Sequence, residues 1–123
     1  MFQNCLYVMA GGAIGALLRY CVAQLCANVR VLTLPIGTFI VNLLGCLLLG
    51  LLTGLAESHS NAPRPLMLML TVGVCGAFTT FSTFSSETIK AAEAGMAWQA
   101  ALYVAASLAF GFLLFWWGKG LFS

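Results

Sequence analysis

The chain has 123 residues, of which 62% are hydrophobic and 7% are charged, and its formal net charge is +2. Because soluble domains carry about 25% charged residues, this composition excludes an ordinary soluble protein and indicates a single membrane-embedded domain over residues 1–123. The small charge, without a basic run, argues against nucleic acid as a partner. Five cysteines without a CxxC pair, together with a single histidine, form no zinc-type ligand pattern.

Four stretches are long and apolar enough to cross a bilayer, which takes about 20 helical residues. We expect transmembrane helices at about 4–27, 33–56, 65–89 and 97–118, joined by short polar connections. Two prolines, Pro35 and Pro65, stand near expected helix starts, where a missing N–H costs least. The fold class expected is therefore an all-α membrane protein with four transmembrane helices.

The basic residues outside the spans are evenly divided between the two sides of the membrane. Arg64 and Lys119 fall on the side of the termini, and Arg30 and Lys90 fall on the other side. The positive-inside rule therefore assigns almost no orientation, and Arg19 near a helix end is the only tie-breaker. Chance in a small count explains this balance. Dual topology, with insertion in both orientations and pairing as an antiparallel homodimer, explains it equally well.

Small residues recur at spacings typical of close helix packing in lipid, as in Gly11 with Gly15 and Gly50 with Gly54. These patterns indicate packing rather than chemistry, either within the chain or between copies of it.

Polar side chains inside the spans are the candidates for function, because they are costly in hydrocarbon without partners. Asn42 either bonds a neighbouring helix or offers amide N–H donors to an anion. Arg19 either extends to the headgroups or sets a positive potential at an aqueous vestibule. In the fourth span Tyr103 and Ser107 are one helical turn apart and continue a polar stripe.

The stretch 73–86 carries the densest polar signal in the chain. Gly73 and Gly76 come first, then six hydroxyl residues among residues 79–86, with phenylalanines at 78, 81 and 84. The glycines predict a third helix broken near mid-membrane, where freed carbonyls are ready cation ligands. Phenylalanine edges can face an anion without a formal charge, and hydroxyls can donate hydrogen bonds to it. Hydroxyls bonded within a kinked helix, with aromatic packing, are the alternative.

Three motifs appear in order along the chain: Gly11-Gly-x-x-Gly-Ala-x-x-Arg-Tyr20, Pro35-x-Gly-Thr-x-x-Val-Asn-x-x-Gly45 and Gly73-x-x-Gly-x-x-Thr-Thr-Phe-Ser-Thr-Phe84. Together they closely resemble the Fluc (CrcB) family of fluoride channels. The resemblance implies a passive, fluoride-selective channel, not an enzyme, that exports fluoride across the bacterial inner membrane and lowers its toxicity. It also implies an antiparallel dual-topology homodimer with two pores.

The resemblance implies roles for particular residues as well. The backbone carbonyls of Gly76 and Thr79, from both subunits, would hold a structural sodium ion at the dimer centre. The anion pathway would consist of Asn42, Phe81, Ser82, Thr83, Phe84, Tyr103 and Ser107, with Arg19 drawing anions into the vestibule. The family often has a second glycine where this chain has Ala77, and a further hydroxyl where it has Gly111.

Other classes fit the sequence less well. A proton-coupled antiporter of the small multidrug type needs an acidic residue inside the membrane, and Glu57, Glu87 and Glu93 are expected at or beyond the ends of the spans. A membrane scaffold would explain the small-residue packing but not Asn42 or the hydroxyl-aromatic run. An enzyme would need a nucleophile-base pair or a metal cluster, which the sequence does not suggest.

Overall fold

The computed structural model describes residues 1–59 and 61–122. Its elements are, in order, α1 (Phe2–Leu25), β1 (Arg30–Val31), β2 (Leu34–Pro35), α2 (Gly37–Ser58), α3 (Arg64–Leu68), the π-helix η1 (Met69–Cys75), α4 (Gly76–Phe78), α5 (Phe81–Glu93) and α6 (Ala97–Gly120). Four helical segments in this part of the chain are long and apolar enough to cross a membrane, with residues 64–93 forming the third. The predicted helical, multi-pass membrane architecture is confirmed.

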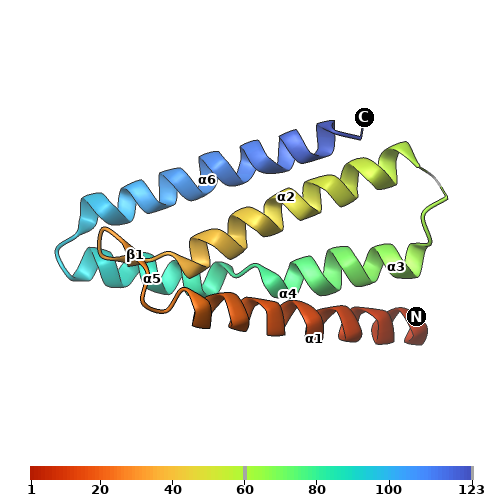
Figure 1. Cartoon of the computed structure of the whole chain (residues 1–123), viewed down its shortest axis with the longest axis horizontal. Helices are drawn as coiled ribbons and strands as arrows, with labels where there is room; N and C mark the ends of the chain where they lie inside the picture. The colour runs from red at the N-terminus through yellow and green to blue at the C-terminus, as the bar shows by residue number, and fades with distance from the viewer. Residues whose placement is uncertain (60, 123) are drawn as a thin grey trace.

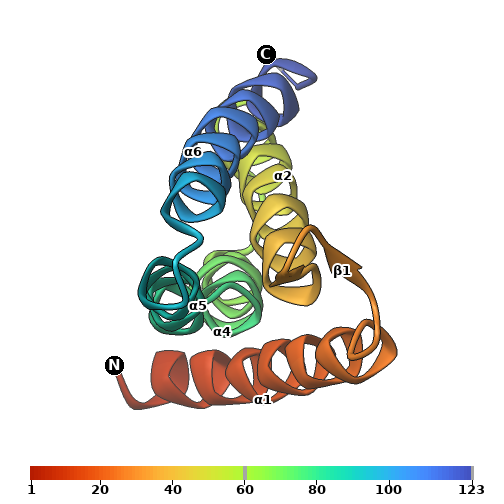
Figure 2. The same ribbon diagram turned by 90° about the vertical axis from the view of Figure 1, so that its left-hand side faces the viewer.

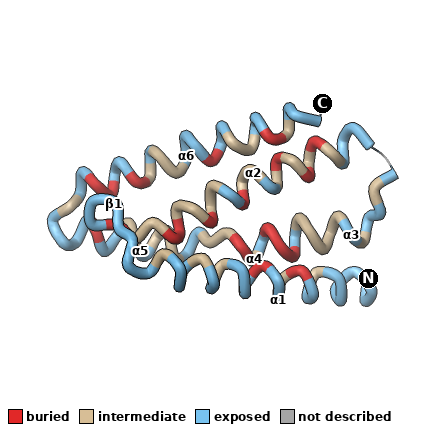
Figure 3. The backbone as a smooth tube through the Cα atoms, in the orientation of Figure 1, coloured by how far each residue is buried: buried red, intermediate tan, exposed pale blue. Residues whose placement is uncertain are grey.

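The four segments form two pairs (Figures 1 and 2). The two members of each pair run in the same direction, and the two pairs run in opposite directions. The helices α2 and α6 pack along each other, and α1 packs along the third segment. Both termini lie at one end of the molecule with the α2–α3 connection, while the β1–β2 hairpin and the α5–α6 connection lie at the other. Buried residues concentrate where helices face each other, and much of the outer surface is exposed (Figure 3).

Glycines set the distance between the paired helices. A Cβ at Gly11 would collide with the Met69 carbonyl, and one at Gly15 would collide with the Val74 carbonyl. On the second pair, Gly50 and Gly54 of α2 lie equally close to the backbone of α6 at residues 115 and 119. The small-residue spacing of the sequence therefore corresponds to backbone-to-backbone packing inside one chain.

A short hairpin precedes α2 and was not predicted from the sequence. Arg30 pairs with Pro35 and Val31 with Leu34, and the turn places Leu32 at a φ of 61°. Thr33 ties the hairpin to α6, because its backbone N–H and its hydroxyl both donate to Oε1 of the buried Gln99, the former at 3.1 Å. These bonds fix the hairpin against α6 at one end of the bundle.

The third segment is interrupted between α4 and α5. The helix ends at Phe78, Thr79 and Thr80 adopt extended conformations (φ/ψ of −82°/158° and −149°/117°), and α5 begins at Phe81. A helix that stops and restarts within one 30-residue membrane segment leaves backbone groups without intrahelical partners, so other side chains must bond them.

Gly15→Ala tests the close packing of α1. The added methyl meets a backbone carbonyl that cannot move away, so we expect destabilisation of about 1–3 kcal/mol, as for other overpacked positions. Gly12→Ala is the matched control, since a Cβ there meets nothing within 4 Å. The measurement is the thermal unfolding midpoint in detergent. Equal midpoints for the two variants would contradict the packing model.

Candidate functional site

The interruption at Thr79–Thr80 is held by Asn42 of α2. The Asn42 amide Nδ2 donates to the Thr80 carbonyl at 3.1 Å, and the Thr80 N–H donates to Asn42 Oδ1 at 2.8 Å. This reciprocal pair replaces two hydrogen bonds that the helix gives up at this point. Asn42 therefore bonds the backbone of the neighbouring third segment at its interruption, and only one of its two amide N–H groups is used in these bonds.

Thr80 is the N-cap of α5, a role that the sequence did not reveal. Its hydroxyl accepts from the Thr83 N–H at 3.2 Å and lies 3.1 Å from the Thr83 hydroxyl and 3.3 Å from the Ser82 hydroxyl. A threonine directly before the first helical residue is a common N-cap. The sequence did not single out Thr80 as this N-cap, because several Ser and Thr residues lie next to it and each of them suits an N-cap.

The interruption opens onto a cavity of about 360 Å³, which we call the central cavity. It brings together six of the ten predicted site residues: Asn42, Gly76, Thr79, Phe81, Phe84 and Ser107. The Ser107 hydroxyl is buried and has no hydrogen-bond partner among the described residues. A buried hydroxyl without a partner is costly, so this position suits a polar ligand.

The predicted aromatic residues form a connected row that begins at the central cavity with Phe81 and Phe84 and continues to Tyr103. The Phe81 and Phe84 ring centroids are 6.0 Å apart with a 46° interplanar angle, and Phe84 and Tyr103 are 5.0 Å apart at 55°. Tilted rings at these distances point edges as well as faces at their surroundings. Phe81 is 78% exposed, whereas Phe78 is 8% exposed and packs inside the chain.

Glu87 is a functional candidate that the sequence reasoning missed. It was expected to flank the third span, but it lies within α5, where its carboxylate accepts from the Thr38 hydroxyl at 2.9 Å and from the Tyr103 hydroxyl at 2.8 Å. Both carboxylate oxygens are thus bonded by hydroxyls from α2 and α6. No sequence signal could bring together three residues from three different helices.

The remaining predicted residues lie around the interruption. Ser82 is exposed, and Thr83 is half-buried beside Thr80. Arg19 reaches across from α1, and its Nε donates to the Ala77 carbonyl at 3.1 Å. Its charge therefore lies at the C-terminal end of the helix that stops at Phe78, where a cation is favoured by the helix dipole.

The backbone carbonyls of Gly76 and Thr79, expected from the sequence as cation ligands, lack the N–H donors that a continuous helix would supply. The Thr80 N–H bonds Asn42 rather than the Gly76 carbonyl, and the Thr83 N–H bonds the Thr80 hydroxyl rather than the Thr79 carbonyl. Carbonyl oxygens freed at helix interruptions have the chemistry that sodium requires. In the described residues no three His, Cys, Asp or Glu side chains cluster as a metal site.

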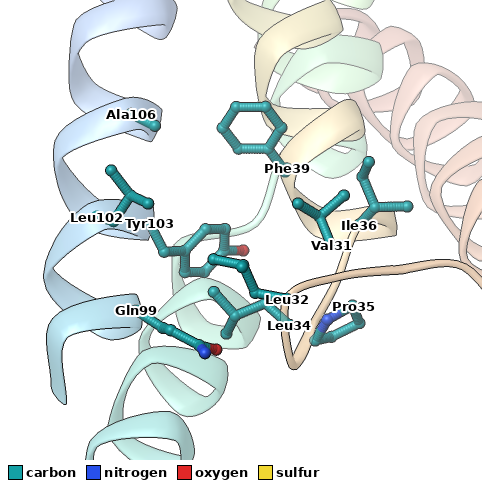
Figure 4. Close-up of a pocket in the computed structure, with 10 residues that line it drawn as sticks. All are labelled: Val31, Leu32, Leu34, Pro35, Ile36, Phe39, Gln99, Leu102, Tyr103 and Ala106. Carbon is teal, nitrogen blue, oxygen red and sulfur yellow. The ribbon is translucent and has the colours of Figure 1, made fainter. Parts of the chain in front are cut away.

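A separate cavity of about 160 Å³ lies between the hairpin and α6 (Figure 4). Its lining is apolar apart from Gln99 and Tyr103, and Tyr103 is the only predicted site residue in it. Phe39 from α2 and Leu102 from α6 face it from opposite sides. A hydrocarbon-lined space of this kind offers no hydration substitute to an ion, so the central cavity is the better candidate site.

The fold and these groups define a small, helical, multi-pass membrane protein with a polar and aromatic cavity at an interrupted segment. Residues 6–119 match the family model described as CrcB-like protein, Camphor Resistance (CrcB). The chain belongs to this family.

Relatives of the chain carry a functional name. The chain is 45% identical over 109 residues to "Fluoride-specific ion channel FluC 1" of Streptomyces avermitilis, covering 89% of this chain and 87% of the relative. It is 42% identical over 113 residues to the fluoride-specific ion channel FluC of Acidobacterium capsulatum, covering 92% and 90%. It is 40% identical over 118 residues to that of Nitratidesulfovibrio vulgaris, covering 96% and 95%. The prediction that the chain is no enzyme is confirmed by this membership.

Proposed function

We propose that the protein is a passive fluoride channel that exports fluoride across the bacterial inner membrane and so lowers its toxicity. The observation that carries the proposal is the central cavity. It joins an amide, two phenylalanine rings and a hydroxyl without a partner among the described residues at a helix interruption, in a chain whose relatives are named fluoride channels.

Fluoride is small and strongly hydrated, so a pore must replace its water with hydrogen-bond donors while binding weakly enough to release it. The free N–H of Asn42 and the Ser107 hydroxyl supply neutral donors, and Phe81 and Phe84 supply the positive ring edges. Ser82 and Thr83 extend the path toward the hairpin end. Neutral groups of this kind pass an anion on rather than trap it.

Arg19, Tyr103 and Glu87 contribute to this path in different ways. Arg19 places a fixed positive charge one residue from the end of α4 and draws anions toward the interruption. The single proton of the Tyr103 hydroxyl is donated to Glu87, so Tyr103 must release that bond before it can donate to an anion. Tyr103 therefore acts together with Glu87 and not as an independent donor.

The conducting unit that we propose is an antiparallel homodimer with two pores. Inside one chain only 11–28% of each transmembrane window is buried, and Phe81 is 78% exposed. A second copy would cover this surface and complete the surroundings of Phe81. Because the basic residues are balanced between the two ends, each chain can insert in either orientation.

At the centre of that dimer we propose a structural sodium ion, bound by the carbonyls of Gly76 and Thr79 from both subunits. The support is the loss of the helical donors for these two carbonyls, described above. The ion would neutralise the carbonyl dipoles where two interruptions meet.

Ion efflux from liposomes that contain the purified protein tests the function. With a potassium shunt, we expect rapid fluoride efflux, little chloride efflux and no dependence on a proton gradient. Phe81→Ile and Asn42→Ala should lower the fluoride rate by roughly tenfold or more, since each loses an interaction with an ion worth about 1.5–3 kcal/mol.

Phe110→Ile is the matched control, because Phe110 lies on α6, is 53% exposed and does not line the central cavity. Equal chloride efflux would reject the fluoride channel. Proton-dependent efflux would favour an exchanger that uses Glu87. Normal rates in both site variants, with intact dimers, would remove Phe81 and Asn42 from the pathway.

Orientation-locking variants test dual topology. Asn61→Lys with Ala62→Lys adds positive charge at the end that carries the termini, and Asn28→Lys with Ala94→Lys adds it at the hairpin end. Since added lysines hold their end in the cytoplasm, we expect each variant to be inactive alone and the co-expressed pair to be active. Wild-type activity from either variant alone would rule out the antiparallel dimer.

Sodium removal tests the proposed ion. Prolonged dialysis against N-methylglucamine should slow fluoride efflux, and sodium should restore it while potassium at equal concentration should not. A central ion buried in the dimer exchanges slowly, so short dialysis serves as the control. Activity that survives prolonged removal would exclude an essential sodium site.

A further inference from the structure

The central cavity also carries two cysteines that have no part in the anion path described so far. Cys46 of α2 and Cys75 of η1 both line it. Both are free, so neither forms a disulfide within the described part of the chain. The sequence showed no ligand pattern among its cysteines, because these two lie on different spans and only the fold brings them to one cavity.

The segments that carry the two cysteines face each other at close range. Gly45, the residue before Cys46, lies so near Thr79 that a Cβ at Gly45 would collide with the Thr79 side chain. Thr79 belongs to the same helical turn as Cys75, because its N–H donates to the Cys75 carbonyl at 3.1 Å. The two cysteines are therefore neighbours across the junction of α2 with the third segment.

The cavity leaves room beside the sulfur of Cys46. A Cβ at Gly111 of α6 would lie 3.4 Å from Cys46 Sγ, and the glycine that stands there also lines the cavity. Cys75 is buried, with 3% of its surface exposed, so its contact with open space is confined to a small part of its surface. Both residues are thus shielded from bulk water but border the same open space.

Two thiols of this kind suit a soft metal ion. Thiolate sulfur selects soft ions such as Cu(I), whereas a structural zinc site takes four ligands. Among the described residues no three His, Cys, Asp or Glu side chains cluster, so the donor set here is limited to the two sulfurs. Hg(II) and Cu(I) both accept two thiolates in a linear arrangement and need no further ligand.

We propose that Cys46 and Cys75 together bind one soft metal ion of this two-coordinate kind, and that the bound ion obstructs the anion path. The obstruction rests on the proposed channel function, whereas the binding does not. Asn42 and Ser107 line the same cavity, so an ion held between the two sulfurs occupies space through which the anion passes.

Mercuric chloride is the probe for this site. Two S–Hg bonds form and two Hg–Cl bonds break, while the two thiol protons pass to water and the chlorides leave as ions. Mercury keeps its oxidation state, so the reaction requires neither an oxidant nor a reductant. Because HgCl2 is uncharged, the guanidinium of Arg19 does not repel it from the interruption as it would repel a free cation.

Metal retention in the full-length protein tests the binding. Cys5→Ser, Cys21→Ser and Cys26→Ser leave only the two cavity cysteines. After HgCl2, about a tenfold excess of N-acetylcysteine removes mercury from single thiols, whereas a pair of facing sulfurs keeps it through a higher effective concentration. We expect native mass spectrometry to show one mercury per chain.

Removal of one sulfur then shows whether both are ligands. In the protein that keeps only the cavity cysteines, Cys46→Ser or Cys75→Ser should weaken retention roughly a hundredfold or more, because each removes a ligand itself rather than a group behind it. Cys46→Ala and Cys75→Ala repeat the measurement without adding a hydroxyl, and gel filtration checks that each variant stays folded. The matched control keeps the other three cysteines and lacks both cavity cysteines, and it should retain no mercury.

Fluoride efflux from liposomes tests the obstruction. The protein with only the two cavity cysteines should lose most of its efflux after HgCl2 and regain it with dithiothreitol, a dithiol that extracts mercury. Each variant that lacks Cys46 or Cys75 should keep most of its own untreated rate, because a single thiol gives mercury up to N-acetylcysteine.

The outcomes separate this inference from the proposed function. No retention with both cysteines present, or retention that survives the loss of either sulfur, overturns the metal site. Retention with unchanged efflux overturns the obstruction. A protein that retains mercury through both sulfurs but moves no fluoride before treatment overturns the channel and leaves the metal site standing.

Discussion

A backbone group inside a membrane must find its hydrogen bond within the protein, and the interruption at Thr79–Thr80 depends on how this requirement is met. Asn42 supplies both a donor and an acceptor to Thr80, and Arg19 supplies a donor to the Ala77 carbonyl. Side chains from α1 and α2 therefore stabilise the interruption of the third segment. The placement of Phe81 and the shape of the central cavity both follow from this arrangement.

The sequence predicted the parts of the fold that depend on local composition. Four apolar stretches predicted four spans. The amide of Asn42 inside one span was identified as a functional candidate, because polar side chains are rare there. The hairpin was missed because its stability comes from Thr33 bonding Gln99, 66 residues away along the chain. A pattern within one window cannot report a contact of that kind.

The candidate site also has a part that could be predicted from the sequence and a part that depends on contacts between helices. Phe81, Phe84 and Ser107 could be named from residue type, spacing and resemblance, and they do line one cavity. The bonds from Thr38 and Tyr103 to Glu87 depend on how three helices face one another. A glutamate near a span end looks like a solvated charge until those neighbours are known, which is why it was placed outside the membrane.

The π-helix η1, Met69–Cys75, has a consequence for everything that follows it. A π turn is equivalent to one additional residue inserted into an α-helix, and each residue of an α-helix turns the chain by about 100°. The faces that α4 and α5 present are thus rotated from those that an unbroken α-helix starting at Arg64 would give. A helical wheel drawn across residues 64–93 therefore misplaces the aromatic row, and η1 helps to set which face of the third segment meets the central cavity.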